Sequence, residues 1–356
     1  MTHERPARSS RDDREERGVV LALVLVITML LSVAVITFAR RATLDAQIAG
    51  NRDAAARAEA LARGGIQIAT FVILKGNAEE DEATDPLPPG DSYLSPWAQL
   101  EDSMIELDTG ETLQIAVEDS GARLNLNAVL GARAVTDAPG DETIEFLVDF
   151  LSKVIDELPL PPGDRFWEPR ELAHNLVEYV DEDEERIRGG DEAGWYERQD
   201  PPYLPANEPL RTVDELGRVE GFDTTLVEGL RPYITVHPRS GGSGVNLNTA
   251  PAHVLATVYH GNQGSRQLAN EDTVRRILRA RDDGEVLCQE SASNDRCVLV
   301  GEIVDGSIFP PPGLGEGARI FTITATASAG NISRTIRATL DMSGAPRPLI
   351  LDWRRL

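Results

Sequence analysis

A dense run of acidic residues has the clearest capacity for chemistry in this sequence. Residues 181–185 are all Asp or Glu, and residues 189–192 follow as Gly-Gly-Asp-Glu. Calcium takes about six to eight oxygen ligands, which combine carboxylates with backbone carbonyls on a loop. The spacing is not that of an EF-hand, and a solvated acidic loop explains the run equally well. The candidate ligands are Asp181, Asp183, Glu185, Asp191 and Glu192.

Two cysteines, Cys288 and Cys297, enclose an eight-residue loop in a chain that has no other cysteine. The pair could form one disulfide in an oxidising compartment, or it could be two unrelated thiols. The flanking apolar runs, 286–287 and 298–300, could face each other as a hairpin that the bond closes. No histidine or further cysteine lies beside them, which disfavours a zinc site.

The remaining residues do not predict an enzyme. The histidines lie apart from any Ser or Cys motif, with His174 in a predicted helix and His253 and His260 in another. The chain has 59 acidic and 35 basic residues, a net charge of −24, which disfavours binding to phosphate backbones. Residues 216–221 and 246–250 nevertheless resemble helix-hairpin-helix elements. A membrane-anchored DNA-uptake protein is therefore the main alternative, although acidic flanks disfavour it.

A long N-terminal helix is the first element that must position these groups. Residues 19–39 form an apolar run of 21 residues, long enough to span a bilayer core of about 30 Å. Arg40 and Arg41 end the run. Residues 42–75 contain no proline and repeat apolar residues at helical spacing, so one helix over 19–75 is predicted. Gly64-Gly65 marks a kink or a point of close packing.

The rest of the chain indicates an α+β fold. Strands are predicted at 103–107 and 112–118, and again at 319–327, 332–341 and 348–353. Helices are predicted between them, at 141–157, 168–180, 212–218, 223–231, 250–260 and 271–282. This order predicts an antiparallel sheet with a large, mostly α-helical insertion.

Residues 124–128 and 245–249 repeat one pattern, in which apolar residues alternate with Asn. The pattern is typical of a strand end at which the last Asn, or the Thr that follows it, caps a helix.

Several motifs taken together resemble one family. Gly18 followed by 19–23 resembles the cleavage site of type IV pilin-like proteins, and the whole chain resembles the K-type minor pseudopilin of type II secretion. The matching segments run through nearly the whole chain in order: 121–127, 179–183, 201–203 with 207–210, 214–216 and 246–250.

The resemblance implies a layout and a processing step. A prepilin peptidase would cut after Gly18 and N-methylate Val19. The implied parts are a leader over 1–18, a transmembrane segment over 19–39, a pilin-like body over 40–140 and 301–356, and an inserted α-helical domain over 141–300. The pilin-like fold packs a long N-terminal helix on an antiparallel sheet. Leu23 occupies the fifth mature position, where most pilin-like subunits have Glu and the K type usually does not.

The resemblance also implies function. K-type subunits cap the tip of the pseudopilus with the I- and J-type minor pseudopilins, and they assist export of folded proteins across the outer membrane. The chain would be a non-enzymatic subunit in the inner membrane, with its body in the periplasm and no nucleic-acid partner. The family binds calcium at an acidic loop like residues 181–192. Ala193 departs from the family, which often has an acidic residue there.

Overall fold

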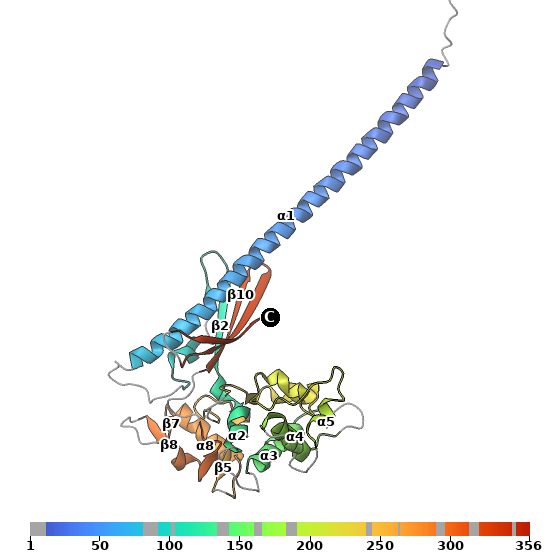
Figure 1. Cartoon of the computed structure of the whole chain (residues 1–356). Helices are drawn as coiled ribbons and strands as arrows, with labels where there is room; N and C mark the ends of the chain where they lie inside the picture. The colour runs from blue at the N-terminus through green and yellow to red at the C-terminus, as the bar shows by residue number, and fades with distance from the viewer. Residues whose placement is uncertain are drawn as a thin grey trace, which may run out of the picture.

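The computed structural model describes residues 12–80, 92–100, 104–133, 142–159, 166–182, 191–239, 244–262, 264–289, 296–312, 320–343 and 347–356. Within the first range, side chains are described from residue 19 to residue 75. The described chain forms two packed bodies, a helix-plus-sheet body and an inserted body (Figure 1).

A single helix, α1 (Asp12–Glu80), forms the N-terminal part of the structure. Its 69 residues span about 100 Å at about 1.5 Å per residue. The apolar segment that begins at Val19 projects away from the body with its side chains exposed, whereas the C-terminal part packs on the sheet (Figure 1). The buried stripe repeats at helical spacing through Ala58, Ala62, Ile66, Ala69 and Ile73. The predicted single helix over 19–75 is confirmed.

Gly65 lies at a close approach of α1 to the sheet. A Cβ atom at Gly65 would lie 2.9 Å from Leu113 Cδ1 and 3.0 Å from Ala325 Cβ. A Cβ atom at Gly64 would meet nothing within 4 Å. The helix continues through both glycines, so close packing rather than a kink explains Gly65.

The sheet has five strands in the order β1-β2-β10-β11-β12, and every neighbouring pair is antiparallel. Alternate residues of β2, β10 and β11 are buried against α1, as expected for a sheet with one covered face. The strands are β1 (Met104–Glu106), β2 (Thr112–Asp119), β10 (Ile320–Ala329), β11 (Ile332–Asp341) and β12 (Leu349–Arg355), and the short helix η1 (Pro96–Leu100) packs beside α1. These positions agree closely with the predicted strands.

The inserted body has its own apolar core, which includes residues from Leu124 to Ile308. The expected limits of 141–300 are therefore too narrow, because β3, α2 and β9 contribute buried side chains to the same core. Its elements are η2 (Ser120–Ala122), β3 (Leu124–Asn125), α2 (Leu126–Arg133), α3 (Glu142–Asp156), α4 (Pro169–Val180), α5 (Ala193–Tyr196), η3 (Val213–Arg218), α6 (Thr224–Leu230), β4 (Ile234–Thr235), α7 (Ala252–Leu255), β5 (Tyr259–Gly261), β6 (Gln267–Leu268), α8 (Glu271–Asp282), β7 (Val286–Cys288), β8 (Cys297–Leu299), α9 (Val300–Ile303) and β9 (Ser307–Phe309).

Two local predictions in this body are wrong. The helix expected over 250–260 is confined to α7, because Tyr259 leaves it to pair with Phe309 in a small antiparallel sheet. His253 therefore lies on a helix but His260 lies on a strand. The expected hairpin around the cysteines is also wrong, since β7 and β8 pair in parallel. The alternation of apolar residues carries no information about strand direction.

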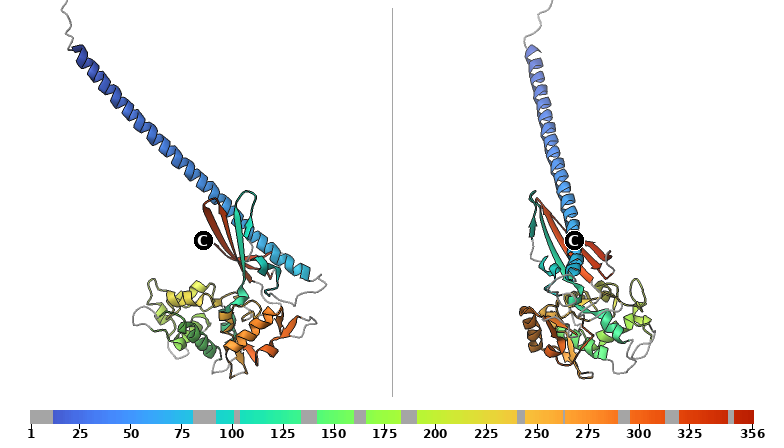
Figure 2. Two further views of the ribbon diagram at one scale, coloured as in Figure 1. Left: turned by 180° about the vertical axis from the view of Figure 1, so that it is seen from behind. Right: turned by 90° about the vertical axis from the view of Figure 1, so that its left-hand side faces the viewer.

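The inserted body lies beyond the sheet, at the end of the molecule opposite the apolar part of α1 (Figure 2). Asp119, at the end of β2, ties the two bodies together. Its carboxylate accepts hydrogen bonds from the Gly121 N–H (2.8 Å), the Asn246 side-chain amide (2.9 Å) and the Thr249 hydroxyl (2.6 Å). The second Asn motif is thereby fixed to the strand that enters the insertion.

Candidate metal centre and the polar network behind it

Three carboxylates converge where α4 ends. Glu178, Asp181 and Glu192 each bring a carboxylate oxygen within 4.8 Å of the others. Glu178 lies in the last turn of α4, Asp181 directly follows that helix, and Glu192 directly precedes α5. Glu178 and Glu192 are only 5% and 2% exposed. Acidic side chains are rarely buried this far unless a cation or hydrogen bonds compensate for the charge.

The ends of two helices bring these groups together. Asp181 leaves the helical conformation, while its N–H still donates to the carbonyl oxygen of Val177 at 3.0 Å. Asp191 holds the turn before α5, because its carboxylate accepts a hydrogen bond from the Ala193 N–H at 2.9 Å. Buried Tyr196 then packs α5 against α4, with its ring centroid 5.8 Å from that of Tyr179.

The cluster agrees with the sequence in part. It includes Asp181 and Glu192 of the predicted ligand set. Asp191 is exposed, and its carboxylate accepts a hydrogen bond within the turn before α5. Asp183 and Glu185 lie outside the described residues. Glu178 was not expected as a ligand. Its position three residues before Asp181, one turn back along the helix, is the signal that would have suggested it.

The donor set suits a hard cation. The three side chains offer only carboxylate oxygens, the ligands that calcium and magnesium prefer. Calcium accepts irregular shells that mix bidentate carboxylates with backbone carbonyls, whereas magnesium requires a near-octahedral shell. Carboxylates from two helix ends, with an acidic sequence between them, favour the irregular shell, so the residues present fit calcium better.

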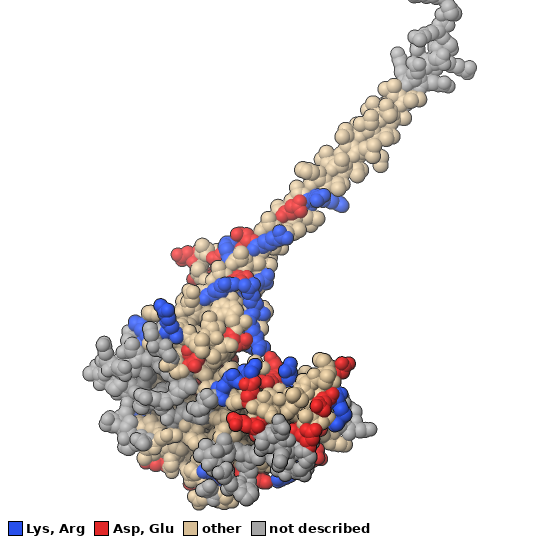
Figure 3. Space-filling view, viewed as in Figure 1, with Lys and Arg blue, Asp and Glu red and all other residues tan. Residues whose placement is uncertain are grey.

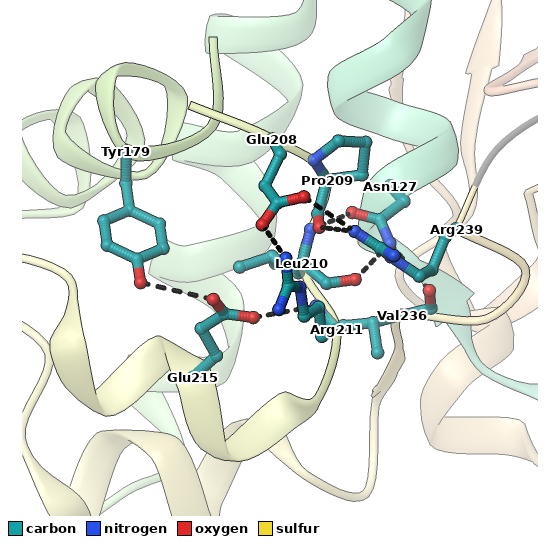
Figure 4. A network of polar contacts seen from close by, with 9 residues as sticks. All are labelled: Asn127, Tyr179, Glu208, Pro209, Leu210, Arg211, Glu215, Val236 and Arg239. Carbon is teal, nitrogen blue, oxygen red and sulfur yellow. Dashed lines mark hydrogen bonds and ion pairs between the residues drawn. The ribbon is translucent and has the colours of Figure 1, made fainter. Parts of the chain in front are cut away.

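A polar network connects the metal centre to the middle of the inserted body (Figure 4). The Tyr179 hydroxyl donates to Glu215 Oε1 at 3.3 Å, and Glu215 Oε2 accepts from the Arg211 N–H at 2.7 Å. Burial, reinforced by the negative charge of Glu215, raises the pKa of Tyr179 to about 12. Tyr179 therefore stays a neutral donor at physiological pH and fixes α4 relative to the segment before η3.

Asn127 forms the next part of this network. Its amide nitrogen donates to the carbonyl oxygens of Leu210 (2.9 Å) and Val236 (2.7 Å), and its amide oxygen accepts from the Leu210 N–H at 2.9 Å. One buried side chain thus satisfies both backbone groups of Leu210, in the manner of a strand neighbour. The first Asn of the motif, Asn125, accepts a hydrogen bond from the Asn127 N–H at 3.1 Å.

The second Asn motif repeats this arrangement. Asn248 donates to the Leu287 carbonyl at 2.9 Å and accepts from the Leu287 N–H at 2.8 Å, while Asn246 accepts from the Asn248 N–H at 3.0 Å. In both copies the first Asn makes the local turn and the second reaches a distant backbone segment. The expectation that the last Asn or the following Thr caps a helix is therefore wrong.

The other predicted sites are placed as follows. Cys288 and Cys297 form a disulfide in the structure, with their Cα atoms 5.8 Å apart. Gly18 and Val19 lie within α1. The helix that contains them includes an 18-residue window with a mean hydropathy of 3.2 and no buried residue, which makes it a candidate membrane anchor.

Residues 216–221, one of the segments with helix-hairpin-helix character, serve packing. Leu216 and Val219 are fully buried in the core of the insertion. Their neighbour Arg218 lies over the ring of Tyr203, 5.8 Å from its centroid.

Comparisons with known proteins show what the chain resembles. The sequence model of the family described as type II secretion system protein K matches residues 122–239, which include the first Asn motif and the carboxylate cluster. The putative type II secretion system protein K of Escherichia coli K12 is 25% identical over 236 residues, 66% of this chain and 67% of that protein. These matches support a K-type pseudopilin.

Further similar proteins point to the same family. The K protein of Klebsiella pneumoniae is 25% identical over 62% of this chain and 63% of its own length. That of Aeromonas hydrophila is 25% identical over 75% of this chain and 76% of its own. The crystal structure of the GspK–GspI–GspJ complex from enterotoxigenic E. coli contains a chain that matches at a TM-score of 0.52 and 19% identity. The match covers 89% of this chain and 99% of that chain, and it supports the helix, sheet and insertion described above.

Proposed function

We propose that this K-type pseudopilin caps the tip of the type II secretion pseudopilus and thereby assists export of folded proteins across the outer membrane. The observation that supports the proposal best is the position of the inserted body. It lies beyond the sheet, at the end opposite the apolar half of α1 (Figures 1 and 2). In a fibre whose subunits pack their N-terminal helices side by side, that volume belongs to the next subunit.

The N-terminal sequence supports the same position. Leu23 is exposed on the apolar part of α1, where most pilin-like subunits have Glu. A carboxylate there is tolerable in an apolar environment when it pairs with the amine of a neighbouring subunit. A subunit that nothing follows does not need that pairing. The chain is accordingly proposed as a structural subunit of low copy number rather than an enzyme.

The proposed location follows from α1. Its apolar segment would lie in the inner membrane, and the two bodies would lie in the periplasm, an oxidising compartment suited to the Cys288–Cys297 disulfide. The proposed partners are the I- and J-type minor pseudopilins. A K chain of the same fold occurs with GspI and GspJ in the E. coli complex, which motivates this choice.

Calcium is the proposed ligand of the carboxylate cluster. Glu178, Asp181 and Glu192 would hold the ion, with further oxygens from the acidic run that includes Asp183 and Glu185. When bound, the ion supplies positive charge that offsets the repulsion between the carboxylates. It would thereby join the ends of α4 and α5 and stabilise the inserted body.

Processing is proposed between Gly18 and Val19, because a charged leader ends there before a long apolar run. Protein extracted from membranes of cells that contain the peptidase should begin at N-methyl-Val19 by intact mass. A Gly18→Val variant should retain residues 1–18. An intact Met1 terminus in such cells would exclude this site.

The function is tested by complementation. A strain that lacks this chain should fail to secrete its type II substrates, and full-length chain should restore secretion and co-purify with the I- and J-type subunits. A chain without the inserted body, whose sheet and α1 remain, should still reach the membrane but lose restriction to the tip. Normal secretion without the chain, together with no I- or J-type partner, would refute the proposal.

A further inference from the structure

The last strand presents an apolar edge that the described structure leaves open. β12 pairs with β11 on one side only, and Leu349, Ile350, Leu351, Trp353 and Leu356 are all exposed. The exposed fraction of Ile350 is 57%. Soluble proteins usually protect edge strands with charges, bulges or cover, because an open apolar edge recruits another strand.

The register shows how this edge is built. Ile350 and Trp353 lie opposite Leu340 and Ala338 of β11, on the face of the sheet that packs on α1. The Leu356 N–H donates to the Thr335 carbonyl at 3.0 Å, so the N–H group of Leu356 points inward toward β11. Inward and outward backbone groups alternate in an antiparallel strand. The N–H groups of Arg355 and Trp353 therefore point outward, where they can bind an added strand.

The edge differs in charge from the rest of the chain. Residues 332–356 contain five arginines and two aspartates, whereas the whole chain has a net charge of −24. Lys and Arg side chains also gather over the sheet and the adjoining part of α1 (Figure 3). Arg355 is paired with Glu59 of α1 at 2.9 Å, and Arg354 is paired with Asp352 at 2.8 Å and with Asp214 at 3.4 Å. Among the residues that the structure describes, no ion pair is present at the other three arginines, Arg334, Arg337 and Arg347. The edge therefore favours an acidic occupant.

We propose that β12 receives an extended segment of a smaller minor pseudopilin, of the I or J type, which extends the sheet as an added strand. The segment would carry apolar residues that pack on Ile350 and Trp353, with acidic residues facing the arginines. This inference rests on the proposed function for the identity of the partner. The kind of segment that would bind, an extended strand with apolar and acidic residues, is inferred from β12 itself.

A second copy of this chain fits the edge less well. Two β12 edges would bring two arginine-rich surfaces together, and like charges facing each other across an interface oppose association. A partner of opposite charge at this edge also suits the low copy number proposed for this subunit.

Photocrosslinking of the full-length chain in secreting cells tests the placement. A benzophenone amino acid replaces Ile350 in one strain. In the control strain it replaces Leu204, which is 64% exposed on the inserted body. The Ile350 strain should yield a crosslink to the I- or J-type subunit that maps to an extended segment, and the control should yield none. A crosslink from position 350 to a second copy, or to the N-terminal helix of the partner, would overturn the proposal.

Binding measurements separate this inference from the proposed function. The variant I350K/W353K should bind the I- and J-type subunits about tenfold more weakly or worse, while L204K binds as wild type. Unchanged circular dichroism and melting temperature would establish that the double variant folds. Wild-type affinity in the folded double variant overturns the β12 surface but leaves the tip function standing. Absence of binding by the wild-type chain overturns both.

Discussion

The substitution Glu192→Gln tests the calcium proposal, because it removes one charge from the cluster while keeping the size of a buried side chain. Two charges 4.8 Å apart repel by roughly 3 kcal/mol at an effective dielectric constant of about 20. The three carboxylates form three repulsive pairs. Removing the charge of Glu192 removes two of them, the pairs with Glu178 and with Asp181. In chelator, the variant should therefore be more stable than wild type. Calcium should add less stability to the variant than to wild type, because a ligand is missing.

The size of the calcium effect follows from linkage. A site of this kind has an affinity of about 10⁻⁶ M or weaker. At free calcium about 100 times the dissociation constant, binding to the folded state adds about 2.7 kcal/mol. For a body the size of the insertion, each kcal/mol shifts the melting temperature by about 2–4 °C. Wild type should therefore melt roughly 5–10 °C higher in calcium than in chelator.

The assay is thermal unfolding in calcium and in EDTA, followed by circular dichroism. Asp191→Asn is the matched control, because Asp191 is exposed and bonds to its own turn rather than joining the cluster. It should keep the full calcium shift, whereas Glu192→Gln loses most of it and Asp183→Ala tests the acidic run. Equal melting temperatures of wild type in calcium and EDTA would refute the site.

Three further predictions concern the fold. Gly65→Val should cost about 1–3 kcal/mol in urea unfolding because its side chain meets the sheet, whereas Gly64→Ala should be neutral or stabilising; equal effects would contradict the packing. Asn127→Ala should cost about 3 kcal/mol, since it strands the buried N–H and carbonyl of Leu210, and an unchanged unfolding midpoint would show that this bond pair adds nothing. Cys288→Ser should cost about 2–3 kcal/mol; two alkylatable thiols in unreduced, periplasm-derived wild type would exclude the disulfide.

Local periodicity was enough to predict the helix-plus-sheet body. The stripe from Ala58 to Ile73 repeats at helical spacing, and β10 alternates buried and partly exposed residues along its whole length. Such patterns depend only on residues that are near one another in the sequence, so they can be recognised without knowledge of the fold. The same reasoning placed α3, α4 and α8 within a residue or two of their ends.

Long-range contacts could not be predicted in this way. Tyr259 leaves a helical pattern because it pairs with Phe309, 50 residues later. Asn127 and Asn248 resemble helix caps, yet their amides reach Leu210 and Leu287. Local sequence contains no signal for such partners.

The candidate metal centre combines both cases. The acidic run suggested either a cation site or a solvated loop, and Asp181 and Glu192 of that run do converge. Glu178 was missed because it stands within the apolar pattern of α4, between Val177 and Tyr179. Its burial follows from the packing of α5 on α4, which are not adjacent in sequence.

Labelling of the intact chain on pseudopilus fibres tests the central claim most directly. An epitope in the inserted body, detected by gold particles in electron micrographs, should mark one end of each fibre and leave the shaft unlabelled. The full-length chain must also restore secretion in the same strain, so that the labelled molecule is the functional one. Gold spaced regularly along the shaft, in a strain that secretes normally, would contradict the tip position.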